Sequence, residues 1–209
     1  MNRLLELLDD GWGHSFTVEN KKSVDKNKLP LPWFTYPSIS YLKKLDLANL
    51  KVFEWGSGNS TIFFENNCLE ITSIDNSVEW HKKVKSMSNG DAQLILCENI
   101  YDYPNVIKKM SDFDIIIIDG IERKKCAQNA LKKLKKNGLI ILDNSDWYWG
   151  AAETLRKSHL LEIPFVGFGP INNYAWSTTF FLGEMFNRFN SSNDSSFVEC
   201  GLEVDPVWD

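Results

Sequence analysis

The fold of this chain is decided by the stretch Val52-Phe53-Glu54-Trp55-Gly56-Ser57-Gly58-Asn59-Ser60-Thr61. Its first residues, with Lys51 before them, predict a short strand over 51–54. Gly56 and Gly58 predict a tight turn, because glycine permits backbone conformations that other residues avoid. Asn59 or Ser60 can cap a helix that continues to about residue 66. A strand, a glycine turn and a helix in this order predict the first unit of an α/β sheet.

Alternating strands and helices continue along most of the chain. We expect further strands at residues 70–74, 93–97, 113–118, 139–142, 163–167 and 177–182, the last two as an antiparallel pair. We expect helices at residues 78–87, 103–110, 126–136 and 149–158. Asn137-Gly138 is expected to end the third of these helices. The alternation favours a parallel, doubly wound sheet, whose ligands collect at the carboxyl ends of the strands.

The residues before the first strand carry a different pattern. Residues 1–35 are expected to be a polar lead-in that ends in a dense aromatic run. Residues 29–37 cannot form a regular helix, because three prolines interrupt them. A short helix is expected after Pro37, where Ile39, Leu42 and Leu45 recur at helical spacing.

The composition of the chain limits its class and its partners. The 209 residues suit one domain with short additions, and the hydrophobic and charged fractions of 43% and 24% are those of a globular protein. The net charge of −5 argues against nucleic acid as a partner. A local basic cluster falls between apolar positions of the expected helix, which favours a solvated helix face. It consists of Lys132, Lys133, Lys135 and Lys136.

The sequence also indicates a cytoplasmic location. Its four cysteines are scattered without a CxxC pair, which argues against a zinc site or a disulfide framework. Residues 1–10 lack the basic segment and the apolar run of a signal peptide. No apolar stretch approaches the length of a membrane span, so no membrane partner is expected.

An acidic residue precedes the glycine turn. Glu54 lies two residues before Gly56, where a carboxylate would repel the pyrophosphate of a dinucleotide. A dinucleotide site would also need a third glycine, where this chain has Thr61. Glu54 instead suits a cofactor with cationic groups, such as S-adenosylmethionine (SAM), which carries a sulfonium and an ammonium. The alternative is a plain glycine turn in another kind of α/β protein.

The next two strands also end in polar residues. Asp75 ends the second strand, 21 residues after Glu54, where its carboxylate can accept hydrogen bonds from both ribose hydroxyls. Glu98 or Asn99, after the third strand, can bond the amino group of adenine. The alternatives are that Asp75 caps the following helix and that Glu98-Asn99 is an ordinary polar loop.

With Glu54-x-Gly56-x-Gly58, Asp75, Asp119 and Asp143-Asn144 on this strand order, the chain resembles the class I SAM-dependent methyltransferases over about residues 50–183. The resemblance implies a Rossmann-like, seven-stranded sheet of order 3-2-1-4-5-7-6 with the seventh strand antiparallel. The stretch 52–61 is similar to a bacterial subgroup whose members mostly lack assigned substrates. The cofactor-binding residues that we expect are Glu54, Gly56, Ser57, Gly58, Asn59, Ser60, Thr61, Asp75, Glu98 and Asn99.

This resemblance also suggests a division of the chain. Residues 50–183 would form the SAM-binding domain. Residues 1–49 would form an N-terminal lid or cap, and residues 184–209, rich in serine and asparagine, a C-terminal tail.

Polar residues end the fourth and fifth strands, beside the expected position of the methyl donor. Asp119, Asp143 and Asn144 offer three oxygen ligands that suit a hard divalent cation such as Mg²⁺. This arrangement is similar to the catechol and caffeoyl-coenzyme-A O-methyltransferases, in which the metal chelates the acceptor hydroxyls. Those enzymes place a lysine base three residues after the first Asp, where this chain has Glu122. The alternatives are a capped turn and a metal-free site with Asp119 as the general base.

Other residues near this edge are candidates for acceptor binding. Arg123 could hold an anionic acceptor with its fork of donors, and His14 is a candidate base in the N-terminal segment. Aromatic residues could form a wall for an apolar or sugar-like acceptor, or could seal the core. They are Trp33, Phe34, Tyr36, Trp147, Tyr148 and Trp149.

These observations predict an enzyme that O-methylates a small hydroxylated acceptor, such as a sugar or a natural product. Two alternatives remain: an NAD-type Rossmann oxidoreductase and a non-catalytic SAM-binding module. The expected partner is the small-molecule acceptor. The sequence leaves the oligomeric state open, with a homodimer as one possibility.

Overall fold

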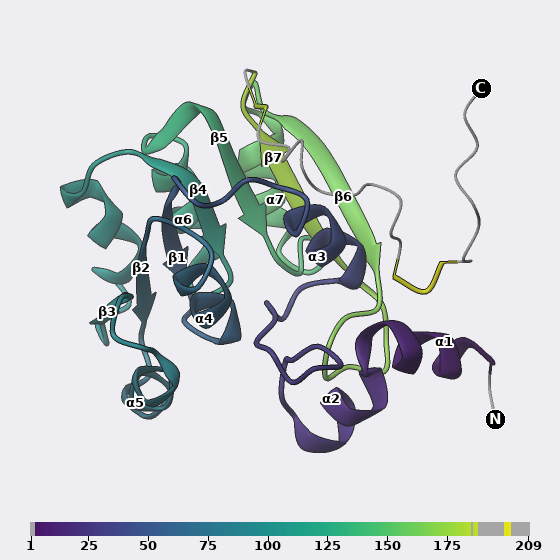
Figure 1. The fold of residues 1–209 in the computed structure, drawn as a ribbon. Coiled ribbons are helices and arrows are strands. Elements are labelled where there is room, and N and C mark those ends of the chain that lie inside the picture. The colour runs from purple at the N-terminus through teal and green to yellow at the C-terminus, as the bar shows by residue number, and fades with distance from the viewer. Residues whose placement is uncertain (1–2, 185, 188–198, 202–209) are drawn as a thin grey trace.

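The computed structural model describes residues 3–184, 186–187 and 199–201, and they form one seven-stranded sheet (Figure 1). The strand order is β3-β2-β1-β4-β5-β7-β6, and β7 is antiparallel to both of its neighbours, so the expected topology is confirmed. The strands are β1 (Lys51–Trp55), β2 (Glu70–Asp75), β3 (Gln93–Leu96), β4 (Phe113–Ile118), β5 (Leu134–Leu142), β6 (Leu161–Gly167) and β7 (Trp176–Leu182).

Helices cover both faces of this sheet. Side chains of α3 and α4 enter the hydrophobic core on one face, and those of η1, α6 and α7 enter the core on the other. The helices are α1 (Arg3–Trp12), α2 (His14–Asn20), α3 (Tyr36–Leu42), α4 (Asn59–Glu65), α5 (Val78–Met87), the 3₁₀ helix η1 (Tyr103–Lys109), α6 (Arg123–Ala130) and α7 (Trp149–Arg156). None of the described helices is long and apolar enough to cross a membrane.

The central strand β4 explains why the sheet is stable. All six of its residues are buried, because it lies between β1 and β5 with helices on both faces. Ile115 and Ile117 point into one core, and Ile116 and Ile118 into the other. Burying one isoleucine side chain contributes about 1.5–3 kcal/mol, so this strand anchors both layers.

The boundary between α6 and β5 differs from the sequence prediction. The helix expected at 126–136 ends at Ala130, and β5 already begins at Leu134. Asn137-Gly138 therefore lies inside the strand, at an irregularity where the pairing steps from Phe113 with Leu134 to Ile115 with Leu139. A β-carbon at Gly138 would lie 2.9 Å from the carbonyl oxygen of Asp114, so the glycine here permits close strand contact.

The N-terminal segment is more ordered than the polar lead-in that the sequence predicted. It contains α1 and α2, separated by Gly13 in a left-handed conformation. Trp12 stacks on Tyr36 with 4.4 Å between ring centroids. Figure 1 shows both helices at the end of the sheet where the parallel strands finish. Most of the expected tail, 184–209, lies outside the described residues.

Candidate cofactor and acceptor site

The loops after β1, β2 and β4 meet at one point. The amide of Gly56 donates to the carbonyl of Ile74 at 2.8 Å, and the amide of Asp119 donates to the carbonyl of Trp55 at 2.9 Å. Gly56 has a φ of 95°, which a residue with a side chain rarely adopts. The expected tight turn is confirmed at this position.

Glu54 lies completely buried beneath this turn. Its Oε2 accepts hydrogen bonds from the hydroxyls of Thr61 at 2.5 Å and Ser73 at 2.6 Å. Burial raises the pKa of Glu54 to about 7, and the nearby charge of Asp119 adds to this effect against the hydroxyl hydrogen bonds. Oε1 is buried and has no partner at hydrogen-bonding geometry, and the Ser60 hydroxyl nearby lowers the pKa of the carboxyl. A buried acceptor without a donor is costly, so this oxygen fits a site that receives a donor from a ligand.

Asp75 connects the second strand to the glycine turn. Its Oδ2 accepts from the amide of Ser57 at 3.1 Å, and its Oδ1 accepts from the amide of Ser77 at 2.8 Å. Burial raises the pKa of Asp75, and these backbone hydrogen bonds oppose that effect. The N-cap of α5 is Ser77, whose hydroxyl accepts from the amide of Trp80, so Asp75 does not cap this helix and instead holds backbone amides of the turns after β1 and β2. Because each carboxylate oxygen can accept more than one hydrogen bond, the ribose role stays open.

The remaining residues of the glycine turn have separate tasks. Thr61, completely buried, donates to Glu54 and accepts from the amide of Gly58 at 2.9 Å. Ser60 is also buried, whereas Asn59 is partly exposed and donates to the carbonyl of Ser23 in the N-terminal segment. Thr61 therefore lies beneath the turn, whereas the Ser60 hydroxyl borders the space beside Gly58.

Gly58 differs from Gly56 in what surrounds it. A β-carbon at Gly58 would meet only the Ser60 hydroxyl, at 3.7 Å, and its backbone is extended. The packing of the chain therefore does not require glycine at this position. Open space over the turn, next to the buried carboxylate, fits a ligand that approaches the backbone closely.

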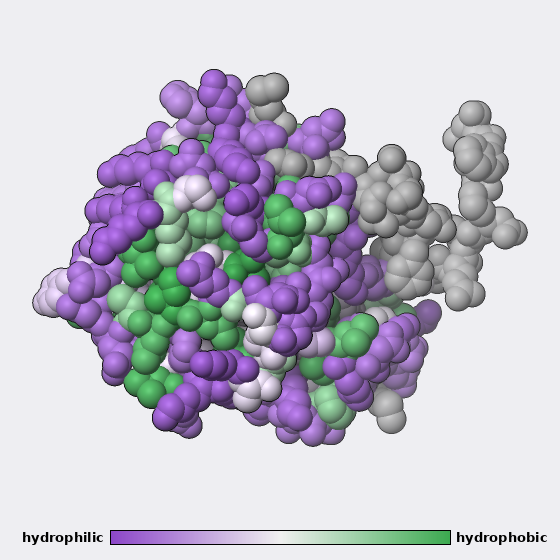
Figure 2. Space-filling view, turned by 60° about the vertical axis from the view of Figure 1, so that its left-hand side comes forward, coloured by the Kyte–Doolittle hydropathy of each residue, from purple (hydrophilic) through white to green (hydrophobic). Residues whose placement is uncertain are grey.

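The end of β3 borders this region on its other side. Glu98 and Asn99 are exposed, and the Asn99 side chain accepts from the amide of Tyr101 at 2.9 Å. Figure 2 brings the β3 edge of the sheet forward and shows hydrophobic side chains gathered on this face. Leu96 and Ile100 are exposed hydrophobic residues at the end of this strand. An apolar surface beside polar groups suits a planar heterocycle, and the adenine role stays a prediction.

Two residues of this region were not predicted from the sequence. Ser73 donates to Glu54, and its hydroxyl lies 2.8 Å from that of Ser57. Trp80 donates from its indole nitrogen to the carbonyl of Ser57, with the Lys83 ammonium 4.0 Å from the ring centroid. The inward position of Ser73 could have been found from the alternation along β2. No sequence pattern marks Trp80.

Arg123 holds the loops after β4 and β5 together. Its Nε donates to the carbonyl of Gly120, Nη1 to the Asp143 carbonyl and the Asn144 side chain, and Nη2 to the carbonyl and Oδ1 of Asp119. These five bonds use all five donors of the guanidinium. The expectation that Arg123 offers a free fork to an anionic acceptor is therefore wrong.

This arrangement does not fit the expected Mg²⁺ ion. Oδ1 of Asp119 and the side-chain oxygen of Asn144, both expected to bind the metal, accept hydrogen bonds from the Arg123 guanidinium instead. Oδ1 of Asp143 accepts from the indole of Trp176 at 3.0 Å and the hydroxyl of Thr178 at 2.5 Å. The described residues contain no group of three His, Cys, Asp or Glu side chains that could hold a metal ion.

Asp119 and Asp143 differ in accessibility. Asp143 is buried, and its pKa is raised by burial and by the nearby charge of Asp119. Burial also raises the pKa of Asp119, against the opposing charge of Arg123. Asp119 keeps 22% of its side chain exposed, and only its Oδ1 is bonded. Asp119 is therefore the carboxylate that a second molecule can reach.

The aromatic residues divide between the core and the surface. Phe34 and Tyr36 are buried, whereas Trp33, Trp147, Tyr148 and Trp149 are exposed. Trp147 lies 6.1 Å from the exposed Tyr174, centroid to centroid. His14 is buried and lies 3.0 Å from the Tyr36 hydroxyl, with a pKa lowered by burial. A buried histidine in this position does not suit the role of an acceptor base.

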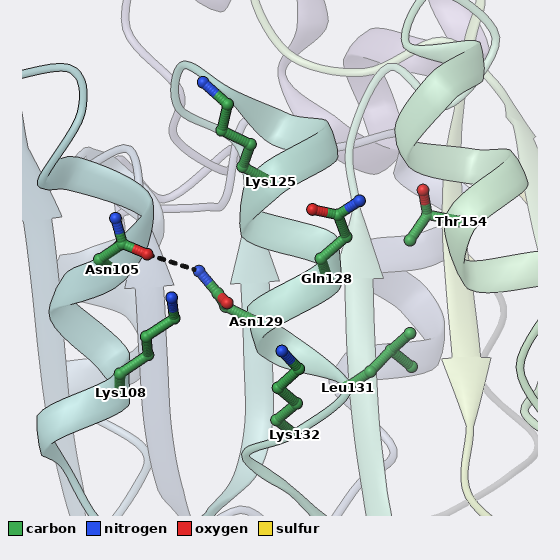
Figure 3. A pocket seen from close by; sticks show the side chains of 8 residues that line it. All are labelled: Asn105, Lys108, Lys125, Gln128, Asn129, Leu131, Lys132 and Thr154. Carbon is green, nitrogen blue, oxygen red and sulfur yellow. Dashed lines mark hydrogen bonds between the residues drawn. The ribbon is translucent and has the colours of Figure 1, made fainter.

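A groove of about 560 Å³ lies outside this region. It runs over α6 between η1 and α7, and lysines and amides line it (Figure 3). Lys125 in this groove is paired with Glu122 at 2.5 Å. None of the strand-end residues described above lines this groove, so it does not take part in the candidate site.

The sequence matches no protein-family model and has no significant relative among curated proteins. Solved structures share the fold. A precorrin-6y C5,15-methyltransferase from Geobacter metallireducens has a TM-score of 0.59 at 15% identity, over 80% of this chain and 96% of its own. Spermidine synthase from Thermotoga maritima has a TM-score of 0.54 at 16% identity, over 67% and 54%. These identities establish the fold alone.

A third structure was solved with a ligand. It is a Streptococcus mutans protein assigned as a methyltransferase and bound to SAH, the demethylated form of SAM. Its TM-score is 0.52 at 15% identity, over 70% of this chain and 96% of its own. The neighbours thus include methyltransferases and a spermidine synthase, so the reaction must be argued from the site.

Proposed function

We propose that this protein binds SAM over the glycine turn and transfers its methyl group to a small hydroxylated acceptor. The observation that carries the proposal is the buried Glu54 carboxylate, which lies under Gly56 and Gly58 with one oxygen unpartnered. A carboxylate in this position favours a cationic ligand and disfavours a pyrophosphate. In doubly wound sheets the cofactor binds at this edge.

The cofactor would be held by residues of three strand ends. Glu54 supplies the negative field for the cationic amino acid part, and Gly58 leaves space for its approach. Asp75 accepts hydrogen bonds from the ribose while it keeps its two backbone amides. Glu98 and Asn99 lie at the adenine end. When bound, SAM supplies an electrophilic methyl group.

Asp119 is the residue that we assign to the acceptor. Its Oδ1 is fixed by Arg123, which leaves Oδ2 to accept the proton of the acceptor hydroxyl. The acceptor oxygen then forms a bond to the methyl carbon while the carbon–sulfur bond breaks, and the electron pair stays on sulfur. Asp119 holds the proton until solvent removes it. The protein contributes position, orientation and a partly desolvated base.

Exposed aromatic rings that follow β5, the neighbour of β4, suggest the class of acceptor. The exposed rings of Trp147 and Tyr174 lie close together after β5 and before β7. Exposed aromatic rings at this end of the sheet suit a sugar-like or aromatic hydroxyl compound, because such molecules have both an apolar face and hydroxyl groups. This supports O-methylation over transfer to a purely apolar molecule.

The alternatives predict different ligands. An NAD-dependent oxidoreductase would place a pyrophosphate at the N-terminus of the helix after β1, and here the Glu54 carboxylate buried at that turn would repel it. A non-catalytic SAM-binding module would bind the cofactor but would have no use for the partly exposed Asp119. Ligand binding distinguishes an NAD-dependent oxidoreductase from the proposed methyltransferase. Turnover distinguishes a non-catalytic SAM-binding module from it.

The test is calorimetric titration of the folded protein with SAH and, separately, with NAD. We expect saturable binding of SAH and none of NAD. The second step is incubation with SAM labelled at the methyl group and a small-molecule extract, with labelled products as the expected result. Absence of SAH binding to folded protein would remove the proposal.

A further inference from the structure

We propose that the Arg123 guanidinium is a fixed positive charge at the ends of β4 and β5, where the acceptor is proposed to bind. We also propose that these strand ends have no binding site for a divalent metal ion. This inference depends on the proposed function only where it treats Asp119 as the base. Its central observation is a ring of five oxygens around one guanidinium, contributed by four residues of two loops. They are the carbonyl and Oδ1 of Asp119, the carbonyls of Gly120 and Asp143, and the Oδ1 of Asn144.

These oxygens are of the kind that hard divalent ions prefer, but each of them already accepts a hydrogen bond from the guanidinium, which stands where the ion would have to bind. The five donor–acceptor distances lie between 2.6 and 3.2 Å. Oxygens that accept hydrogen bonds from a guanidinium lie farther from its central carbon than the roughly 2.0–2.6 Å between Mg²⁺ or Ca²⁺ and its oxygen ligands. A metal ion would therefore have to displace Arg123 and draw the two loops together.

Displacement of Arg123 is opposed by its surroundings. Only 7% of its side chain is exposed, and the Tyr148 ring covers it with 4.0 Å between the guanidinium carbon and the ring centroid. This contact adds a cation–π attraction to the five hydrogen bonds. The fixed positive charge also repels a second cation that approaches the same oxygens.

The backbone on both sides is shaped for this arrangement. Glu122, directly before α6, has a φ of 53°, and Asn144, after β5, has a φ of 49°. Left-handed conformations are uncommon for residues with side chains, and such positions persist where surrounding contacts hold them. The turn at Glu122 starts the helix so that Arg123 reaches back to the strand ends, and the Asn144 side chain accepts from it.

The consequence is a positioning role for Arg123. It neutralises charge beside Asp119 and Asp143, and it fixes one Asp119 oxygen while the other stays accessible. The expectation drawn from the sequence placed a divalent ion among these carboxylates. In this protein the Arg123 side chain supplies the positive charge there.

The test uses Mn²⁺ as the probe and the ligand-free protein. Electron paramagnetic resonance should show no saturable Mn²⁺ binding to the wild type at millimolar concentration, and chelator should leave its melting temperature unchanged. Arg123→Met removes the charge and should raise Mn²⁺ affinity at least tenfold. Arg123→Lys keeps the charge and should show no such gain. Arg156→Met, at an exposed ion pair with Glu162, is the matched control.

Two results would overturn the proposal. One is saturable Mn²⁺ binding to the wild type that Asp119→Asn weakens, because the metal then binds beside Arg123. The other is a folded Arg123→Met protein with unchanged Mn²⁺ affinity. If Arg123→Met does not fold, the wild-type titration alone decides. Neither measurement involves SAM, so failure here is distinct from a failure to bind SAH.

Discussion

The carbonyl oxygen of Asp119 lies 2.7 Å from the point where a β-carbon at Gly56 would stand. The glycine turn after β1 and the loop after β4 are therefore in direct backbone contact. The proposed cofactor turn and the proposed base share this contact, so any side chain at position 56 would push the two apart. Position 58, two residues later, has no such restriction.

The first prediction uses this difference. Gly56→Ala should destabilise the protein, because its φ of 95° and the Asp119 contact both exclude a β-carbon. Gly58→Ala should leave the melting temperature within experimental error, since its β-carbon would enter open space. We nevertheless expect Gly58→Ala to weaken SAH binding at least tenfold, because the added methyl group occupies the ligand's space.

Melting curves and SAH titrations of both variants check this prediction. Gly90→Ala is the matched control, since Gly90 has a positive φ of 106° with nothing within 4 Å of its β-carbon position and lies away from the turn. It should lose stability and keep SAH affinity. Unchanged SAH affinity in Gly58→Ala would mean that no ligand approaches the turn there.

The second prediction concerns pH. The pKa of Glu54 is raised to about 7 in the ligand-free protein, and a cationic ligand binds the ionised form. Affinity for SAH should therefore rise with pH through about 7, by roughly tenfold between pH 6 and pH 8. Glu54→Gln should bind weakly at both pH values, because the amide does not ionise. Calorimetry at the two pH values measures the difference.

Glu70→Gln serves as the control for this experiment. Glu70 is exposed at the start of β2 and pairs with Lys51, away from the strand ends. Its SAH affinity should follow the wild-type pH dependence. A pH-independent affinity in the wild type would show that Glu54 does not face the cationic part of the ligand.

The sheet topology and the strand-end residues could be predicted because their signals are local. The apolar run at 113–118 and the glycines at 56 and 58 mark a buried strand and a turn within a few residues. Carboxyl ends of parallel strands share one edge, so Glu54, Asp75 and Asp119 were expected together, and the loops that carry them do meet. The parallel strand order therefore brings residues that are predicted separately to one end of the sheet.

The features that were missed depend on contacts between distant residues. Asn137-Gly138 carries the signature of a helix end, but the close approach of Gly138 to Asp114 places it in a strand. Arg123 is adjacent to Glu122 in sequence, and only the left-handed turn at Glu122 directs it toward Asn144. Neither the spacing of residues nor the composition of the chain predicts that turn.

The third prediction separates the two roles of Asp75. Asp75→Ala should lower the melting temperature, because the amides of Ser57 and Ser77 lose their acceptor. The ribose role is tested with adenosine and 2′,3′-dideoxyadenosine. The wild type should prefer adenosine by roughly tenfold or more, as expected for hydrogen bonds to a charged group, and Asp75→Ala should show almost no preference. Equal preference in both proteins would assign Asp75 to the backbone alone.

The last prediction separates cofactor binding from turnover at Asp119. Asp119→Asn keeps an oxygen for the Arg123 hydrogen bond, so the loops after β4 and β5 should stay in place. Affinity for SAH should remain within about twofold of the wild type. Methyl transfer to the acceptor found in an extract should fall by about 10²–10⁴, the usual contribution of a general base. Asp112→Asn, at an exposed residue before β4, should keep full activity. Undiminished transfer by Asp119→Asn would remove Asp119 as the base, because the asparagine amide cannot accept the acceptor's proton at neutral pH.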